Sequence, residues 1–452
     1  MIKRAMFIAF LLVPMLSTMA QDTSQAVLRE KVAEAKDAID GINETLTEMK
    51  TTLSALSKIK ISGYMQSQLT ASSGAGGYAG APTSGPTAVG NFQGGALGSG
   101  VSTRFLVRRG RVKIMYDNDL TQFVLQFDAT QGGFTTKDAY VYVKEPWLKT
   151  FALTAGIFDR PFGFEISYSS SNREAPERTR MYQTLFPGER GLGMKIEAIP
   201  TESMGLLSLF NLKFGVFNGT GSSANEADNL KDVIGRLGVS LPFQEQNIAL
   251  DAGVSIYAGG VKDNYSKYIY KKVNIIDSTA SNKGATFGRT YYGIDAQLYA
   301  DLLPIGGSSL RAEIITGQQP GTKDDNRSLG SITYPFTGHL YLRNFLGYYA
   351  ALIQNIGLQH QFVVRYDAFI PNMDVSAKHI GETGSNMGLG DLSYTTIGIG
   401  WVYYYDANVK FVVYYDMISN DTVSPATTTA TYKPFMKDLQ DDVLTFRVQY
   451  KF

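Results

Sequence analysis

The segment 161–190 holds a dense group of charged side chains that could attract and select ions. Its basic members are Arg173, Arg178, Arg180 and Arg190, and its acidic members are Glu165, Glu174, Glu177 and Glu189. Arg and Lys side chains that line a narrow passage select anions at close quarters, so the segment could form a constriction with an electric field across it. The alternative interpretation is an ordinary outer loop in which mixed charges are simply solvated.

Other kinds of chemistry have weak support. The chain has no Cys, which excludes disulfide scaffolds, thiolate metal sites and thiol nucleophiles. His339, His360 and His379 are scattered, so we expect no metal site and no other cofactor. No nucleophile motif stands out, and we therefore do not expect an enzyme. Lys and Arg number 42 against 41 Asp and Glu, a balance that argues against a nucleic-acid partner.

The first residues have the pattern of an export signal. Lys3 and Arg4 precede an apolar stretch from Ala5 to Leu16, and small residues lead up to Gln21. This pattern predicts a cleaved signal peptide over 1–20. A transmembrane anchor is the alternative, but the apolar stretch is too short to cross a bilayer.

A heptad pattern follows within 21–58 and predicts a periplasmic coiled-coil helix. Apolar residues recur at alternating spacings of four and three at Leu28, Val32, Ala35, Ile39, Ile42, Leu46, Met49, Leu53 and Leu56. A strict 3.5-residue repeat keeps one narrow seam facing partner helices. The alternative is a single amphipathic helix packed on a globular core, which usually has a wider apolar face.

From residue 59 onward the apolar period changes to two. Near the end of the chain, for example, Leu444, Phe446 and Val448 alternate with Thr445 and Arg447. About sixteen segments show this pattern, at 59–70, 104–117, 120–130, 137–145, 149–160, 191–199, 206–217, 231–241, 247–258, 286–299, 309–318, 339–353, 357–369, 394–405, 408–419 and 442–452.

The connections between these segments alternate between tight turns and long polar loops, as in outer-membrane barrels. We therefore predict an all-β fold, a 16-stranded antiparallel transmembrane β-barrel over 59–452, preceded by the short helical coiled coil. An even strand number places both ends of the barrel on the periplasmic side. The Gly-rich segment 74–100 is expected to be a flexible outer loop.

The alternation also predicts which charges face the lumen. Inward positions include Arg109, Arg111, Lys113 and Arg160, within a general excess of basic over acidic residues. Such a lumen would concentrate anions. Arg108 has the opposite parity, which predicts that it faces lipid or a neighbouring subunit.

Several motifs resemble the phosphate-selective porin O and P family of Gram-negative outer membranes. They are Arg108-Arg109-Gly110-Arg111-Val112, the segments 137–141 and 156–165, Glu177-Arg178, the segment 188–193 and the terminal Phe452. The resemblance implies a trimeric sixteen-stranded channel. It also implies that the constriction holds Arg108, Arg109, Asp138, Arg160, Arg178 and Arg190.

The sequence thus predicts an outer-membrane porin that allows passive diffusion of small polar solutes and leans to anions such as phosphate. Expected partners are membrane lipid, lipopolysaccharide, small anionic or polar solutes and two further copies of the chain. The candidate pore-lining residues are Arg108, Arg109, Arg111, Lys113, Asp138, Arg160, Arg173, Arg178, Arg180 and Arg190. A plugged structural or adhesive barrel is the main alternative, and an outer-membrane hydrolase is a third.

Overall fold

The computed structural model describes residues 25–74, 85–222, 226, 229–327 and 338–452, with side chains described from Glu34 onward. The predicted signal peptide over 1–20 lies outside these residues. The chain divides into two compact units, Met1–Ile59 and Lys60–Phe452.

In the described part of the first unit, residues 25–57 form the helix α2 (Gln25–Ser57), which is about 50 Å long at 1.5 Å per residue. Six apolar side chains of the predicted heptad seam are between 47% and 69% exposed: Ile39, Ile42, Leu46, Met49, Leu53 and Leu56. A seam of this kind is a surface for another helix, and its partner remains a prediction. None of the helices in the described residues is both long and apolar enough to cross a membrane.

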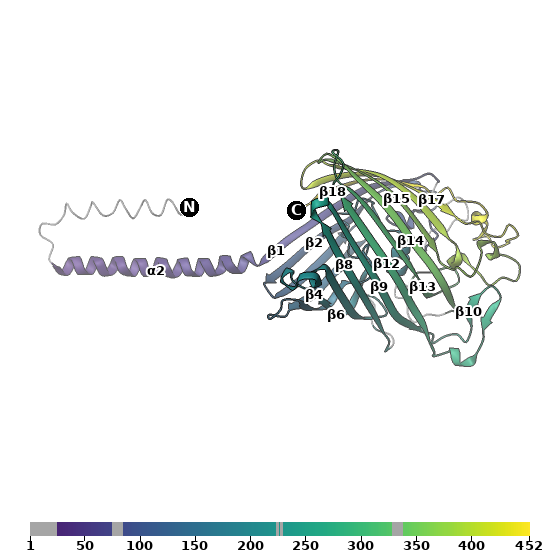
Figure 1. Ribbon diagram of the computed structural model, residues 1–452, viewed down its shortest axis with the longest axis horizontal. Coiled ribbons are helices and arrows are strands. Elements are labelled where there is room, and N and C mark those ends of the chain that lie inside the picture. Colours follow the sequence, from purple (N-terminus) through teal and green to yellow (C-terminus); the bar gives the residue numbers. More distant parts are fainter. Residues whose placement is uncertain (1–24, 75–84, 223–225, 227–228, 328–337) are drawn as a thin grey trace. The chain divides into compact units, whose positions relative to one another are not determined.

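The second unit is a closed antiparallel barrel of sixteen strands (Figure 1), which confirms the predicted fold. Each strand pairs with the next along the chain, and β1 pairs with β18 to close the cylinder. The strands are β1 (Ile59–Ser72), β2 (Thr103–Asn118), β3 (Thr121–Thr130), β4 (Gly133–Lys144), β5 (Phe151–Asp159), β6 (Arg190–Ala198), β7 (Phe210–Asn218), β8 (Lys231–Phe243), β9 (Ile248–Lys262), β12 (Thr286–Ala300), β13 (Ser308–Gly321), β14 (Leu340–Ile356), β15 (His360–Ile370), β16 (Tyr394–Tyr404), β17 (Val409–Asn420) and β18 (Val443–Lys451).

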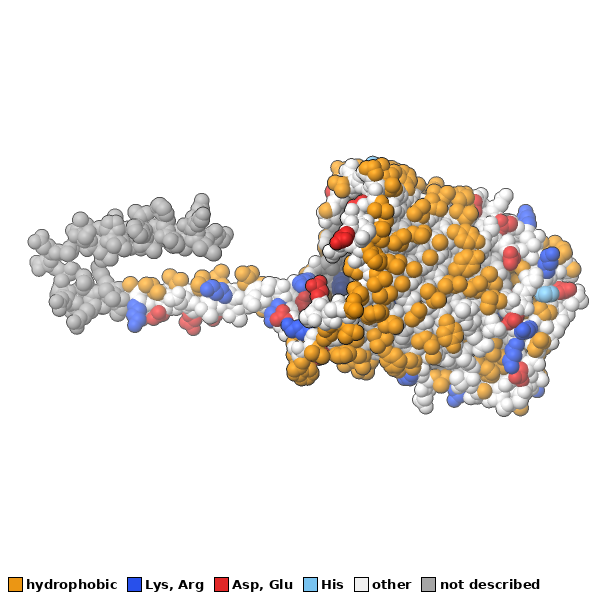
Figure 2. Space-filling view, in the orientation of Figure 1, with side chains coloured by type: hydrophobic (Ala, Val, Ile, Leu, Met, Phe, Trp, Pro, Cys, Tyr) orange, Lys and Arg blue, Asp and Glu red, His pale blue; other side chains and the backbone are white. Residues whose placement is uncertain are grey.

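The alternation of side chains along the strands follows the predicted period of two. On β18, Leu444 and Phe446 point outward and are 43% and 41% exposed. Arg447 on the same strand points into the barrel and is 2% exposed. Figure 2 shows apolar side chains over the visible face of the barrel wall, with charged side chains gathered toward the end that carries the long loops. We call this end the loop end, and the end where β1 begins and β18 finishes the turn end.

Two local elements differ from the prediction. The connection 263–285 contains a short hairpin, β10 (Ile269–Lys272) and β11 (Ile275–Asp277), and β10 pairs in parallel with the start of β14. Strands of four and three residues are too short to show an alternating pattern in the sequence. The predicted strand 206–217 begins only at Phe210, because Glu202–Leu209 form the 3₁₀ helix η2.

The connection 160–189, between β5 and β6, lies inside the barrel and is called the inward loop below. It includes the short helix α3 (Arg180–Leu185). One face of this loop is apolar and packs in a single cluster against inward side chains from the barrel strands β7, β8, β9 and β12 to β17, together with Phe158 of β5. The loop contributes Phe162, Ile166, Ala175, Met181, Tyr182, Leu185 and Phe186 to this cluster. Full burial of each large side chain stabilises the fold by roughly 1.5–3 kcal/mol, which holds the loop against this wall.

Part of the Gly-rich loop is packed rather than free, contrary to the prediction of a flexible outer loop. Val89, Phe92 and Leu97 are buried, and Gln183 of the inward loop donates a 2.9 Å hydrogen bond to the carbonyl oxygen of Phe92. The apolar residues among the glycines therefore pack residues 85–102 against the part of the inward loop that contains α3. Composition alone could not show this, because it averages over the few residues that pack.

Candidate functional site

Two polar cavities lie on the charged side of the inward loop, toward strands β1–β6. The first has a volume of 480 Å³ and lies toward the turn end. It is bounded by the inward loop, the start of β1, the second half of β2 and the end of β18. We call it the turn-side cavity. Its charged lining consists of Arg111, Lys113, Asp138, Asp159, Arg178, Arg190, Lys195, Glu197 and Lys451.

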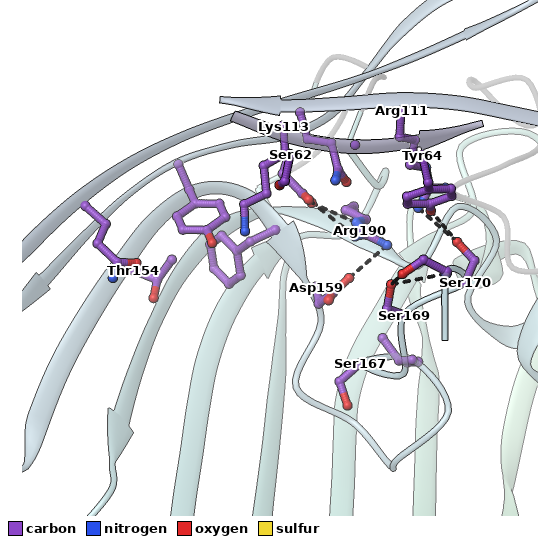
Figure 3. A pocket seen from close by; sticks show the side chains of 18 of the residues that line it. Ser62, Tyr64, Arg111, Lys113, Thr154, Asp159, Ser167, Ser169, Ser170 and Arg190 are labelled. Carbon is purple, nitrogen blue, oxygen red and sulfur yellow. Dashed lines mark hydrogen bonds and ion pairs between the residues drawn. The ribbon is translucent and has the colours of Figure 1, made fainter. Parts of the chain in front are cut away.

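Serines form much of the remaining lining of the turn-side cavity. Figure 3 shows Lys113 and Ser62 extending from the neighbouring strands toward the loop, which carries Ser167, Ser169 and Ser170 on the opposite side. The hydroxyls of Tyr64 and Ser170 are 2.5 Å apart, and Arg111 donates to Ser170 at 3.2 Å. The cavity wall is therefore a mixture of cations and neutral hydroxyls.

The second cavity has a volume of 280 Å³ and lies toward the loop end; we call it the loop-side cavity. Its charged lining consists of Arg108, Arg109, Arg111, Asp128, Lys137, Arg173, Glu177, Arg178, Glu189 and Arg327. Asn91 and Phe92 of the Gly-rich loop also line it. Arg111 and Arg178 line both cavities, so the two polar spaces meet at these side chains.

Glu177 is the point at which three arginines converge. Its carboxylate oxygens lie 2.8 Å from Arg108 Nε, 2.6 Å from Arg109 Nη2 and 2.9 Å from Arg447 Nη2. Burial alone would raise the pKa of Glu177, but these guanidiniums lower its pKa well below the ordinary value. Glu177 thus stays ionised and ties the inward loop to β2 and β18.

Backbone contacts reinforce this attachment from two further strands. Arg365 on β15 donates to the carbonyl oxygen of Glu177 at 2.9 Å, and Arg447 donates to that of Pro176 at 2.8 Å. Lys410 on β17 donates to the carbonyl oxygen of Arg173 at 3.1 Å. The loop backbone is therefore fixed at 173, 176 and 177.

A second carboxylate, Glu189, fixes the far end of the inward loop. It pairs with Arg178, with Lys137 Nζ at 2.9 Å and with Arg190 Nη1 at 3.0 Å. Burial alone would raise the pKa of Glu189, but Arg178, Lys137 and Arg190 lower its pKa well below the ordinary value. Arg178 also donates to the carbonyl oxygens of Glu165 and Ile166, both at 2.7 Å. These bonds hold the Arg178 guanidinium where the cavities meet.

The start of the loop is anchored on the opposite wall by Glu313 of β13. Its carboxylate accepts from the backbone N–H groups of Phe164 and Glu165, both at 2.8 Å, and from the Tyr182 and Tyr349 hydroxyls at 2.5 and 2.6 Å. Gly163 adopts a φ of +60°, and a Cβ there would overlap the Tyr182 hydroxyl. Glycine is therefore required at the bend that brings this anchor together.

Eight of the ten residues predicted to line a pore do line one of the two cavities: Arg108, Arg109, Arg111, Lys113, Asp138, Arg173, Arg178 and Arg190. Arg160 and Arg180 line neither. The Arg160 guanidinium lies 5.0 Å from the centre of the Phe186 ring and donates to the Pro187 carbonyl oxygen at 3.3 Å. Arg180 lies between the rings of Phe92 and Tyr394, at 4.3 and 3.7 Å. Both brace the loop.

The prediction that Arg108 faces lipid or a neighbouring subunit is wrong. Its guanidinium reaches inward and forms two hydrogen bonds with Glu177, at 2.8 and 2.9 Å. The pairing between β2 and β3 begins only at Arg111 and Asp128, so the alternation of that ladder does not extend to Arg108. Two arginines that are adjacent in sequence therefore bind the same carboxylate.

Lys137 is the main cationic residue that the candidate set missed. In the pairing of β3 with β4, Gln126 faces Asp138 and Phe127 faces Thr136, so Lys137 is an extra residue in a β-bulge. The bulge allows Lys137 and Asp138 both to reach the lumen, where strict alternation permits only one. No signal in a single sequence marks this bulge. The serines of the turn-side cavity also escaped notice, because polar residues are ordinary in a loop.

Within the described ranges, no three His, Cys, Asp or Glu side chains gather in a way that could hold a metal ion. The two cavities offer guanidinium and ammonium donors instead. Guanidinium groups match the geometry of phosphate and carboxylate oxygens, so the chemistry available here is the binding of oxyanions.

Comparison with known proteins supports the fold assignment. The chain resembles the anion-selective porin from Comamonas acidovorans with a TM-score of 0.52 and 11% identity, covering 87% of this chain and 99% of that one. It also aligns with the outer membrane channel DcaP of Acinetobacter baumannii and with Salmonella typhi OmpF, each at a TM-score of 0.48, 11% identity and coverage of 87% and 97%. No family model and no curated protein sequence matches. The chain therefore has the porin fold, and at this identity the likeness concerns the fold alone.

The convergence on Glu177 predicts a large effect on stability. Replacing Glu177 by Ala leaves Arg108, Arg109 and Arg447 without their shared counter-charge, and breaking a buried ion pair in this way costs about 3–5 kcal/mol. The free energy of unfolding in lipid vesicles, measured by urea titration, should fall by that amount.

The matched control is Lys60→Ala, which breaks the exposed pair between Lys60 and Asp117. Exposed pairs contribute about 0–1 kcal/mol, so this variant should unfold nearly like the parent protein. Equal losses in the two variants would contradict the role assigned to Glu177.

Proposed function

We propose that this protein is an outer-membrane porin that allows small polar solutes to diffuse passively along the β1–β6 wall. The observation that carries this proposal is the meeting of two polar cavities, of 480 and 280 Å³, at Arg111 and Arg178 inside a closed barrel. On this proposal, a solute moves from the loop-side cavity to the turn-side cavity beside these two side chains. The inward loop, 161–190 in our sequence-based definition, forms the constriction.

The charges along this route favour anions, with phosphate as the leading candidate. The loop-side cavity has seven cationic and three acidic side chains in its lining, and the turn-side cavity has six and three. Ion pairing within the lining reduces the attraction at each residue, but the excess of positive charge remains. A focused positive potential raises the local concentration of anions and speeds their entry.

The surroundings of the barrel follow from the same proposal. Export after removal of residues 1–20 would bring the chain to the outer membrane, where the apolar outer wall contacts membrane lipid. The turn end would face the periplasm and the loop end the exterior, next to lipopolysaccharide. The helical segment 21–58 would then be periplasmic.

A plugged structural or adhesive barrel is the second candidate, and one observation favours it. The inward loop forms a continuous apolar cluster with the β7–β17 wall, and the outer connections 371–393 and 421–442 form a second cluster at the loop end. Such packing could serve to seal the bore and display the outer loops. Ion conduction distinguishes the two candidates.

The porin proposal is tested by the conductance and reversal potential of the purified protein in a planar lipid bilayer. We expect discrete channels and, in a potassium chloride gradient, a reversal potential of the sign produced by chloride movement. The double variant R111Q/R178Q should lower the ratio of chloride to potassium permeability severalfold, because both residues line both cavities.

The control is K231Q, which removes one exposed cation from the loop end of β8 and should leave selectivity nearly unchanged. Cation preference in the parent protein would contradict the anion assignment. Complete absence of conductance would favour the plugged barrel.

The exposed heptad seam supports assembly of the porin as a homotrimer. A 3.5-residue repeat fits another helix with the same repeat, and copies of the chain in one membrane would present their helices in parallel and in register. The resemblance to the phosphate-selective porin family supplies the number of three, and Ile39 and Ile42, at one pair of core positions, agree with three or more helices. The trimeric coiled coil would join the subunits outside the membrane.

Cysteine cross-linking tests the assembly, because the chain has no Cys of its own. In I42C the new thiols lie on the seam and should form disulfide-linked dimers within the trimer under mild oxidation, seen on a denaturing gel. In E44C the thiol lies on the outer face of the same helix turn and should remain monomeric. Equal cross-linking of the two variants, or none in I42C, would contradict the coiled coil.

A further inference from the structure

Most cationic side chains that line the loop-side cavity are already committed to carboxylates. Arg108 and Arg109 pair with Glu177, and Lys137 and Arg178 pair with Glu189. The remaining pairs are Arg111 with Asp128 at 3.1 Å and Arg327 with Asp325 at 2.6 Å. These six cations contribute to the field but have little capacity left to hold a solute.

Arg173 differs from the other six. Arg173 is 5% exposed and is one of the residues that line the loop-side cavity, yet none of its three side-chain nitrogens has a hydrogen-bond partner among the described residues. Its backbone is held from β17 by the bond from Lys410. A guanidinium has five N–H donors, and leaving them unused in a buried place is costly.

The electrostatic surroundings of Arg173 favour an additional negative charge. Burial lowers the pKa of Arg173 well below its ordinary value, and the nearby Arg178 and Arg109 add to this effect. Glu177 and Glu165 act in the opposite direction, but neither forms a hydrogen bond with Arg173. An anion that accepts from the guanidinium would supply both the charge and the acceptors that are missing.

We propose that Arg173 is the seat at which a small, multiply charged oxyanion rests in the loop-side cavity before it passes Arg111 and Arg178. The proposal rests on the porin function and adds the residue and the ligand class to it. Inorganic phosphate, inorganic sulfate and small dicarboxylates share the required chemistry, namely two oxygens that accept from one planar guanidinium. The volume of 280 Å³ lies just below the pockets of roughly 300–1,000 Å³ that hold drug-sized ligands, which suits a small ion with part of its water.

The seat assigned by the structure departs from the one implied by the resemblance. The adjacent arginines Arg108 and Arg109 would be the obvious anion-binding pair, but both already donate hydrogen bonds to Glu177. A single uncommitted guanidinium also suits transport, because a solute must bind weakly enough to leave. With one seat, only one oxyanion is held in the cavity at a time.

The test measures single-channel conductance against the concentration of potassium phosphate, potassium sulfate and potassium succinate. A channel with a binding seat saturates, and the parent protein should saturate with these salts. In R173Q the half-saturating concentration of phosphate should rise about tenfold or more. R173K keeps the charge but lacks the planar fork, so it should give an intermediate value and provides a second variant if R173Q does not assemble.

The matched control is R327Q, which removes the same charge from the lining of the same cavity at a committed side chain. We expect its half-saturating concentration to change less than threefold. A parallel rise in R327Q and R173Q would overturn the seat, as would unchanged saturation in both R173Q and R173K. Parent channels that conduct without saturating would also overturn the seat while leaving the porin function intact, whereas a parent protein that does not conduct would remove the porin function itself.

Discussion

The structure depends on one constraint: the buried carboxylates of a charged loop have to be paired with cations inside a barrel. Taking a carboxylate out of water is costly unless several donors surround it. Glu177 meets this requirement with Arg108, Arg109 and Arg447, and Glu189 meets it with Arg178, Lys137 and Arg190. Since these partners come from β2, β4, β6 and β18 as well as from the loop, the ion pairs fix the loop against one particular part of the wall.

The two faces of the inward loop then divide the lumen into parts with different properties. The apolar face packs against inner side chains of the barrel strands from β7 to β17. The charged face looks toward β1–β6, where the two polar cavities remain. The same charges that attach the loop also set the potential along the open side, so stability and ion preference cannot be tuned independently at Glu177 or Glu189. Arg173 forms none of these pairs, so under the proposed function it is the position at which ion binding can change without loosening the loop.

The sequence predicted the barrel well, because the period of two is imposed on every strand by the contrast between lipid and lumen. The same period located Arg109, Arg111, Lys113 and Asp138 among the cavity-lining residues, whereas Arg173, Arg178 and Arg190 came from the charge density of the segment 161–190 and Arg108 from the family resemblance. It failed where the ladder is irregular: Lys137 lies in a bulge, and Arg108 lies beyond the first residue pair of β2 with β3. It also could not show which arginines are committed, since ion pairs such as Arg447 with Glu177 join residues 270 positions apart. The short hairpin β10–β11 and the packed part of the Gly-rich loop depend on contacts of the same long-range kind.

Blocking each side of the inward loop separately shows whether conduction follows the β1–β6 side. K113C places a thiol in the turn-side cavity, and A249C places one on β9 in another space, of 720 Å³, at the turn end. Each variant would be labelled with a bulky thiol reagent, which has no native Cys to attack. If conduction follows the β1–β6 side, labelling K113C sharply lowers single-channel conductance, while labelling A249C leaves it nearly unchanged. An equal loss in both variants, or a loss only in A249C, would contradict it.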